Sequence, residues 1–159
     1  MANKIQNFDT GEKDNSNIIH LDLDPKINIE NKIYFKNLLK KIAECSLDNL
    51  EENLENLYHV DAEFNGFHPI NEIKGIEEIK NKYLIPLKKA FPDLERRNNL
   101  VIGGAFRDKV FVSFISHLTG TFKNEWLGVK PTNKTIYLRT CEAHQITNNK
   151  IIKSYTLID

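Results

Sequence analysis

The sequence predicts an α+β fold in which helices come first and pack on a curved antiparallel sheet. Between residues 28 and 90, apolar residues recur with the spacing of amphipathic helices, and from Leu94 onward they recur at every second position. Near the C-terminus, Asn148-Asn149 separates two alternating segments, and asparagine tolerates the positive φ that a two-residue hairpin turn requires. Helices followed by consecutive strands are typical of α+β proteins.

The composition is that of a soluble globular protein, with 40% apolar and 28% charged residues in a chain of 159. We expect residues 1–25, which are rich in Asn, Asp, Lys and Ser, to form a flexible polar tail, and residues 26–159 to form a single domain. Lys plus Arg and Asp plus Glu both number 22, and no long basic stripe is present, so no nucleic-acid partner is expected. The chain has no long apolar run and no visible secretory signal, which predicts no membrane span and a cytoplasmic location.

Three helices are predicted in the first part of the domain. The first covers Asn28–Glu44 and the second Asp48–Tyr58, each with one apolar face. The third covers Ile76–Ala90 and follows Gly75. Pro86 lies inside this third pattern and has no N–H to donate, so we expect a kink or a restart of the helix near Ile85.

The strands follow, and together they predict a sheet that curls over the helices. Gly103-Gly104 predicts a turn or bulge, and strands with such bulges tend to curve. Helices on the concave side of a curved sheet would enclose a cavity. A terminal hairpin is expected within Lys134–Asp159. The strands expected before it are Asp61–His68, Arg96–Ile102, Lys109–Thr119 and Thr121–Lys130.

The first strand of the terminal hairpin carries Glu142 and His144, two residues apart and therefore on one face. The same face carries apolar residues, such as Ile146. A carboxylate on a mainly apolar inner face should have a raised pKa because burial disfavours its charge, which suits proton transfer near neutral pH. The alternative is that this face is simply the one exposed to solvent, and the spacing alone leaves both open.

Two further histidines are candidates for the same site. His117 lies within the expected central strand, where a hydrogen-bonded core histidine is the alternative, and His68 directly precedes Pro69. A metal site formed by His68, His117 and His144 has no HxH or HExxH spacing to support it, so we predict no metal. Because GxGxxG and GxxxxGK[ST] motifs are absent from the sequence, no nucleotide cofactor is expected.

Several motifs, taken in order, resemble the SnoaL-like polyketide cyclases (ester cyclases) of the NTF2-like superfamily. The resemblance covers roughly Ile29–Asp159. The motifs are Phe67-His68-Pro69 with Asn71-Glu72 and Gly75, Pro86-Leu87 with residues 90–97 (AFPDLERR), residues 117–122 (HLTGTF), Trp126-Leu127-Gly128 with Pro131-Thr132, and Leu138-Arg139 with Glu142, His144, Lys150-Ile151 and residues 157–159 (LID).

The resemblance implies an NTF2-like cone, in which three helices pack on a curved sheet, and a homodimer formed through the outer face of the sheet. In the characterised cyclases a carboxylate on the penultimate strand is the acid/base for an aldol cyclisation that uses no metal or organic cofactor. That position falls on Glu142, where the characterised cyclases have Asp. The longer side chain moves the carboxylate by about one bond length, and displacements of about 1 Å matter in proton transfer.

We therefore predict cofactor-free acid/base chemistry, either aldol cyclisation or isomerisation, on a small apolar carbonyl compound. Glu142 would transfer the proton, and three histidines, His68, His117 and His144, would orient it or bind the enolate oxygen. The alternative is a non-catalytic module for binding a small ligand or for dimerisation. An interior filled by apolar side chains would argue against both kinds of pocket and favour a role in assembly. The residues expected to line the pocket are Phe67, Tyr83, Trp126 and Tyr155.

Overall fold

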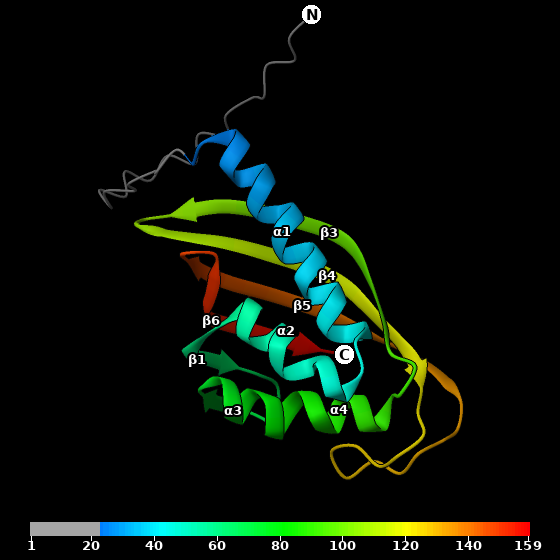
Figure 1. Ribbon diagram of the computed structural model, residues 1–159. Coiled ribbons are helices and arrows are strands. Elements are labelled where there is room, and N and C mark those ends of the chain that lie inside the picture. The colour runs from blue at the N-terminus through cyan, green and yellow to red at the C-terminus, as the bar shows by residue number, and fades with distance from the viewer. Residues whose placement is uncertain (1–22) are drawn as a thin grey trace, which may run out of the picture.

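The computed structural model describes residues 23–159, which form helices on one face of a single curved sheet (Figure 1). Residues 1–22, which include most of the predicted polar tail, lie outside the described residues. The α+β fold class is confirmed. The elements are α1 (Pro25–Glu44), η1 (Leu47–Asn49), α2 (Leu50–Leu57), β1 (Tyr58–Asn65), β2 (Glu72–Lys74), α3 (Ile76–Ile79), η2 (Lys80–Leu84), α4 (Ile85–Ala90), β3 (Glu95–Phe106), β4 (Lys109–Thr121), β5 (Thr135–Thr147) and β6 (Lys150–Ile158).

Helix α1 begins three residues earlier than the apolar spacing predicts. The Asp24 carboxylate caps it by accepting hydrogen bonds from the backbone N–H groups of Lys26 and Ile27, at 2.7 and 3.2 Å. Pro25 occupies the first helical position, where the missing N–H costs nothing. The start of this helix is therefore set by its cap, which periodicity does not detect.

The third helix is irregular just before its proline, and the α-helix restarts at Ile85, as predicted. Gly75 precedes the helix with φ of 87°, a left-handed conformation that glycine adopts without strain. The chain is α-helical in α3, widens to a π-helix in η2 and returns to α-helix in α4, which contains Pro86 in its first turn. The π-helical turn carries Tyr83 and Leu84, which face the interior.

The sheet has the strand order β2-β1-β6-β5-β4-β3. All neighbouring pairs are antiparallel except β1 and β6, which run parallel, so the prediction of a wholly antiparallel sheet is wrong at this one pair. The two strands are far apart in the sequence, and a local turn signal cannot reveal their pairing. The terminal hairpin is confirmed, with Asn148 and Asn149 at φ of 50° and 58°.

Two strand predictions are wrong. Gly103 and Gly104 lie inside β3, and the register shift occurs between Asn98 and Leu100 instead. The segment predicted as a strand over residues 121–130 leaves the sheet after Thr121, and only an isolated bridge joins Trp126 to Val129. Alternation of apolar residues does not distinguish a strand from a loop whose aromatic side chains pack on the core.

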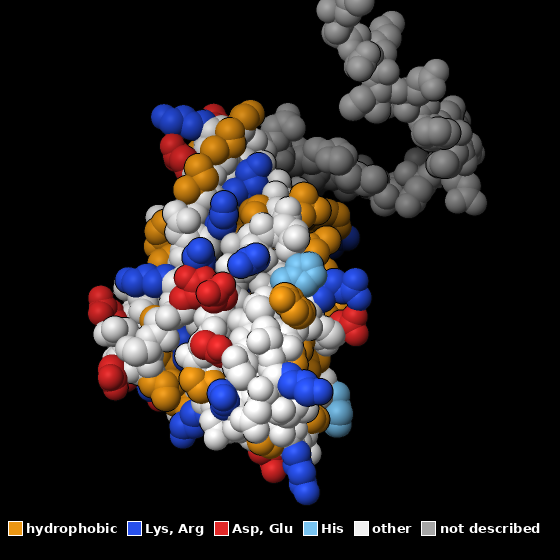
Figure 2. All heavy atoms as spheres, turned by 90° about the vertical axis from the view of Figure 1, so that its right-hand side faces the viewer, with side chains coloured by type: hydrophobic (Ala, Val, Ile, Leu, Met, Phe, Trp, Pro, Cys, Tyr) orange, Lys and Arg blue, Asp and Glu red, His pale blue; other side chains and the backbone are white. Residues whose placement is uncertain are grey.

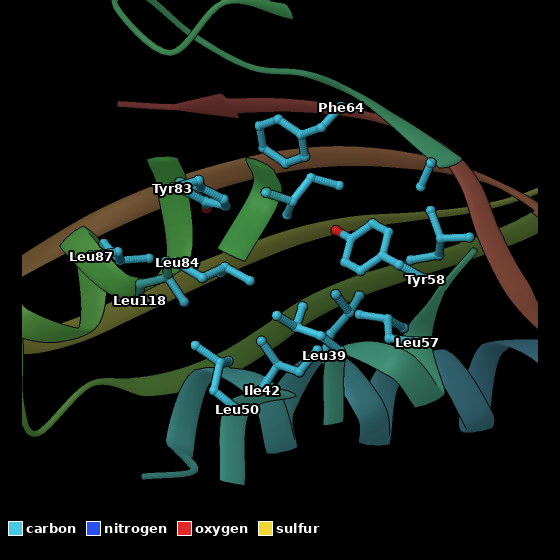
Figure 3. Packing of buried hydrophobic residues seen from close by; sticks show 14 of the residues in the cluster. Leu39, Ile42, Leu50, Leu57, Tyr58, Phe64, Tyr83, Leu84, Leu87 and Leu118 are labelled. Carbon is cyan, nitrogen blue, oxygen red and sulfur yellow. The ribbon is translucent and has the colours of Figure 1, made fainter. Parts of the chain in front are cut away.

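The core lies between the helices and the concave face of the sheet. Figure 3 shows its side chains converging from α1, α2 and the segment that carries Tyr83, Leu84 and Leu87. Side chains alternate strictly along β4 and β5, so each strand has one buried face and one outer face. Within residues 23–159, no helix is both long enough and apolar enough to cross a membrane.

Candidate functional site

A small cavity of about 40 Å³ lies inside the cone, between the helices and the inner face of the sheet. By this measure a single water molecule needs roughly 10–15 Å³, so the cavity has room for a few waters at most. Most of the interior is therefore filled by side chains. The residues lining the cavity are Leu39, Ile42, Ala43, Leu57, Tyr58, Phe64, Tyr83, Leu84, Leu87, Lys88, Leu94, Arg96, Leu118, Glu142, His144 and Thr156.

The polar end of the cavity is dominated by a buried ion pair between Arg96 on β3 and Glu142 on β5. The two guanidinium nitrogens Nη1 and Nη2 donate to the two carboxylate oxygens at 2.9 and 2.7 Å. Both side chains are 5% exposed. The guanidinium also donates to Ser116 Oγ at 3.1 Å and to Asn98 Oδ1 at 2.9 Å. Such a two-pronged contact fixes the position and the plane of the carboxylate.

His144 extends this polar group along the sheet, from β5 to β6 and β1. Its Nε2 lies 3.3 Å from Glu142 Oε2, and its Nδ1 lies 2.9 Å from Ser154 Oγ. Ser154 Oγ is in turn 3.5 Å from the hydroxyl of Tyr58. An ionised carboxylate only accepts hydrogen bonds, so Nε2 carries a proton toward Glu142. A buried chain of four polar groups thus runs from Glu142 to Tyr58.

The expected raised pKa of Glu142 is wrong. Burial does raise the pKa, but the positive charge of Arg96 and the hydrogen bonds from His144 and Arg96 lower it by more, so the pKa of Glu142 lies well below its usual range. Glu142 is ionised at neutral pH. The apolar neighbours of Glu142 on its strand suggested burial, but they did not reveal the cation opposite it.

Two tyrosine hydroxyls complete the polar lining. Burial raises the pKa of Tyr58 to about 12, and burial also raises the pKa of Tyr83, with the negative charge of Glu142 adding to the effect. Both phenols therefore keep their protons at any physiological pH. A protonated phenol can donate a hydrogen bond, so these groups suit a carbonyl oxygen better than a cation.

Of the residues predicted for the site, Glu142, His144 and Tyr83 border the cavity and the others do not. His117 lies on the other face of β4, where its Nδ1 is 2.7 Å from Asn99 Oδ1. His68 is exposed in the loop after β1. The expected convergence of Glu142, His117 and His68 on one cavity is therefore absent.

The three predicted aromatic wall residues other than Tyr83 also lie elsewhere. Tyr155 is 46% exposed on the outer face of β6. Phe67 and Trp126 pack edge to face on each other, with ring centroids 6.0 Å apart, beside the core rather than on the cavity. The ring centroids of Phe67 and Tyr83 are 6.2 Å apart, so this aromatic group packs against Tyr83, which lines the cavity.

Arg96 and Tyr58 are among the site residues that the sequence did not single out. Arg96 is adjacent to Arg97, and nothing in the doublet itself distinguishes the buried residue from the exposed one. Strand alternation could have done so, because Arg96 lies two positions after the buried Leu94 and therefore on the same face. Tyr58 was assigned to the end of the second helix, whereas it is the first residue of β1.

Solved structures support the same fold. AclR from Streptomyces galilaeus, described as a "putative hydroxylase", is 20% identical with a TM-score of 0.65, over 83% of this chain and 90% of that one. A "putative SnoaL-like polyketide cyclase" from Jannaschia sp. CCS1 is 15% identical with a TM-score of 0.65, over 87% and 91% of the two chains. A nuclear transport factor 2 (NTF2-like) superfamily protein from Salmonella enterica is 14% identical with a TM-score of 0.61, over 82% and 89%.

A comparison with curated proteins finds no match. The family model for the SnoaL-like polyketide cyclases matches residues 36–159, which include every helix-facing strand and the whole polar group around Glu142. This match spans well over half of the chain and includes the whole terminal hairpin. The chain therefore belongs to the SnoaL-like polyketide cyclase family, within the NTF2-like fold.

Proposed function

We propose that the cone interior binds a small, largely apolar carbonyl compound and performs acid/base chemistry on it, with aldol cyclisation or isomerisation as the reaction class. One observation carries this proposal. A carboxylate, an imidazole and two protonated phenols, from Glu142, His144, Tyr58 and Tyr83, border one cavity whose other walls are mainly apolar. Apolar walls with a few convergent polar groups are the usual form of a small-molecule site.

In this proposal the phenols bind the carbonyl oxygen and Glu142 removes the adjacent proton. Donors that meet an oxygen where negative charge develops stabilise the enolate. Glu142 in its present contacts is a weak base, because Arg96 holds its pKa low. Proton transfer therefore requires that the ligand draws Arg96 partly away from Glu142. Binding also requires the helices to move outward, since the cavity now measures only about 40 Å³.

The test is exchange of the α-hydrogens of cyclohexanone for deuterium in D2O, followed by NMR. We expect wild-type protein to accelerate exchange, Glu142→Gln to abolish the acceleration and Tyr83→Phe to reduce it. Because Glu142→Gln leaves Arg96 without its charge partner, its fold is checked by circular dichroism, and Tyr83→Phe provides the second, milder variant. Tyr137→Phe, on a residue that is 71% exposed, is the control. Equal exchange rates for wild type and Glu142→Gln would refute the role of Glu142.

A second function, non-catalytic binding of a small ligand, is favoured by a different observation. Both carboxylate oxygens of Glu142 already accept hydrogen bonds from Arg96. This arrangement holds the carboxylate as a fixed polar group of the cavity wall and does not favour its action as a base. This alternative predicts that cyclohexanone raises the melting temperature of the protein without accelerating exchange. The acid/base proposal predicts both effects together.

We also propose a homodimer formed through the outer face of the sheet. A row of directly paired residues, Leu100, Ile115, Cys141 and Leu157, crosses strands β3 to β6 on this face. Leu157 is 64% exposed, and contiguous exposed apolar rows are typical of interfaces. Light scattering should give twice the chain mass for wild type and the single mass for Leu157→Glu. A monomeric wild type would contradict this assembly.

A further inference from the structure

Lys88 on α4 is a buried lysine that the proposed acid/base chemistry does not use. Its side chain is 7% exposed. The ammonium Nζ donates to the backbone carbonyls of Ala43 and Cys45, at 2.9 and 2.7 Å, where α1 ends. Within residues 23–159 it forms no ion pair with a carboxylate, and Glu44 beside it is engaged by Lys40 at 3.7 Å. Lysine is rarely buried without such a partner.

Lys88 also lines the cavity that holds Glu142 and Tyr83. Burial lowers the pKa of the Lys88 ammonium, and this effect exceeds those of the Cys45 thiol and the Glu44 carboxylate, which raise it. Leu84 and Leu87, from the same helical segment, make the surroundings apolar. A lysine in an apolar pocket releases its proton more readily and then presents a nucleophilic amine.

We propose that Lys88 is a covalent carbonyl-binding site, at which a small apolar aldehyde or ketone is held as an imine. The proposal rests on the proposed function in one respect, namely that carbonyl compounds enter this cavity. The amine lone pair forms a C–N bond to the carbonyl carbon while the C=O π electrons move to oxygen. The ammonium releases one proton to solvent before the attack, and after it a second proton passes from nitrogen to oxygen to give the carbinolamine. A proton from solvent then protonates the hydroxyl, which leaves as water while the nitrogen lone pair forms the C=N bond. The product is a protonated imine, the net proton count is unchanged, and the step needs no oxidant or reductant.

The hydrogen bonds of Lys88 are compatible with this product. A protonated imine keeps one N–H, which can still donate to one of the two α1 carbonyls that the ammonium now contacts. The other carbonyl loses this donor. The covalent state therefore retains half of the contacts that hold the end of α1 against α4, and the helix pair stays joined while the ligand is bound.

The test is reductive trapping with butanal as the probe. Full-length protein is incubated with butanal and sodium cyanoborohydride, which converts an imine to a stable secondary amine, and labelled lysines are located by peptide mass spectrometry. Because a bound carbonyl has a high effective concentration at the amine, we expect Lys88 to be labelled at least about tenfold faster than Lys89. Lys89 is the internal control, since it is the next residue of the same helix and is exposed.

A matched variant and a second probe complete the design. Lys88→Arg keeps a donor for the α1 carbonyls but cannot form an imine, so fast labelling should disappear. Glyoxylate, which is charged, should label Lys88 no faster than Lys89 because the cavity walls are apolar.

Labelling of Lys88 by butanal at the rate of Lys89 would overturn the proposal. This ratio is measured in wild type, so it can be obtained whether or not Lys88→Arg folds. Fast labelling of Lys88 without α-hydrogen exchange would support the imine site and refute the acid/base function. Exchange without fast labelling of Lys88 would support the acid/base function and refute the imine site.

Discussion

The two faces of the central strands differ in what their side chains do, although both are rich in apolar residues. On the inner face of β5, Glu142 and His144 are buried and each makes hydrogen bonds at distances of 3.3 Å or less. On the outer face of the same strand, Cys141 is exposed and Arg139 pairs with Asp159 at the surface. The inner face holds a fixed polar group, and the outer face offers surface for contact.

This difference shows that the face of the strand on which a residue lies, more than its type, decides whether the residue belongs to the candidate site or to the surface. His117 and His144 are both strand histidines, yet one is on the outer face and the other is almost fully buried. Arg96 and Arg97 differ in the same way. On the side of the molecule drawn in Figure 2, acidic and basic side chains are interspersed, and no large area of one sign appears there. The buried pair of Arg96 and Glu142 lies inside the cone.

Replacing the buried cation should have the largest effect on stability. Arg96→Leu leaves Glu142 buried without its charge partner, and removing one member of a buried pair costs about 3–5 kcal/mol. Arg97→Leu, at an exposed neighbour whose contact with Glu95 is 3.8 Å, should change the unfolding free energy by less than about 1 kcal/mol. Urea denaturation at pH 7 measures both. Similar losses for the two variants would remove the distinction between the faces.

A pair of leucine truncations tests packing across the same two faces. Leu118 is 3% exposed on the inner face and Leu157 is 64% exposed on the outer face. Leu118→Ala should cost about 3 kcal/mol because it leaves a cavity in the core. Leu157→Ala should cost less than about 0.5 kcal/mol at protein concentrations that keep the chain monomeric. An equal cost would indicate that the outer face is as well packed as the inner one.

The pH dependence of stability should identify the inner carboxylate. The folded-state pKa of Glu142 is below the ordinary value of 4.5, so its stabilising effect is complete above that pH and is lost as the pH falls below it. Below about pH 4.5, wild type should lose up to about 1.4 kcal/mol per pH unit more than Glu142→Gln. Glu63→Gln is the control, because the pKa of Glu63 is also lowered but its pair with Lys153 is at the surface. Parallel acid unfolding curves for wild type and Glu142→Gln would contradict this account.

The smallest predicted effect is that of a single hydroxyl. Tyr83→Phe keeps the ring packed on Phe64, with centroids 4.9 Å apart in wild type, so stability should change by less than about 1 kcal/mol. If the hydroxyl donates to a ligand carbonyl, the dissociation constant of cyclohexanone should rise about two- to tenfold. Isothermal titration calorimetry measures it, with Tyr137→Phe as the outer-face control. Unchanged affinity would exclude Tyr83 from ligand binding.

Much of the fold could be predicted from the sequence because most of it is encoded by local patterns. The helical period, the alternating period and the turn at Asn148-Asn149 all act over a few residues, and they locate the helices and the terminal hairpin. The parallel pairing of β1 with β6 could not be predicted in this way, because it depends on where the chain returns after the seven elements from β2 to β5. The cap at Asp24 and the π-helical turn before Pro86 could also not be predicted from apolar spacing alone.

The candidate site was predicted less completely than the fold. Alternation correctly places Glu142 and His144 on one face, since their own strand fixes that relation, but it left open whether that face is buried. It does not say which residue of another strand lies opposite, so the contact from Arg96 and the resulting low pKa of Glu142 were missed. His117 was misassigned to the pocket because both faces of β4 are apolar, and the choice between them depends on where the helices pack.

The most direct test of the central claim is methyl NMR during titration with cyclohexanone. The claim is that a carbonyl ligand binds on the inner face of the sheet, beside Glu142. Leu84, Leu87 and Leu118 line that cavity, whereas Leu100 and Leu157 lie on the outer face. We predict saturable chemical-shift changes at the first three leucines and none at the other two. Shifts confined to Leu100 and Leu157 would show that the ligand binds the outer face and would contradict the account.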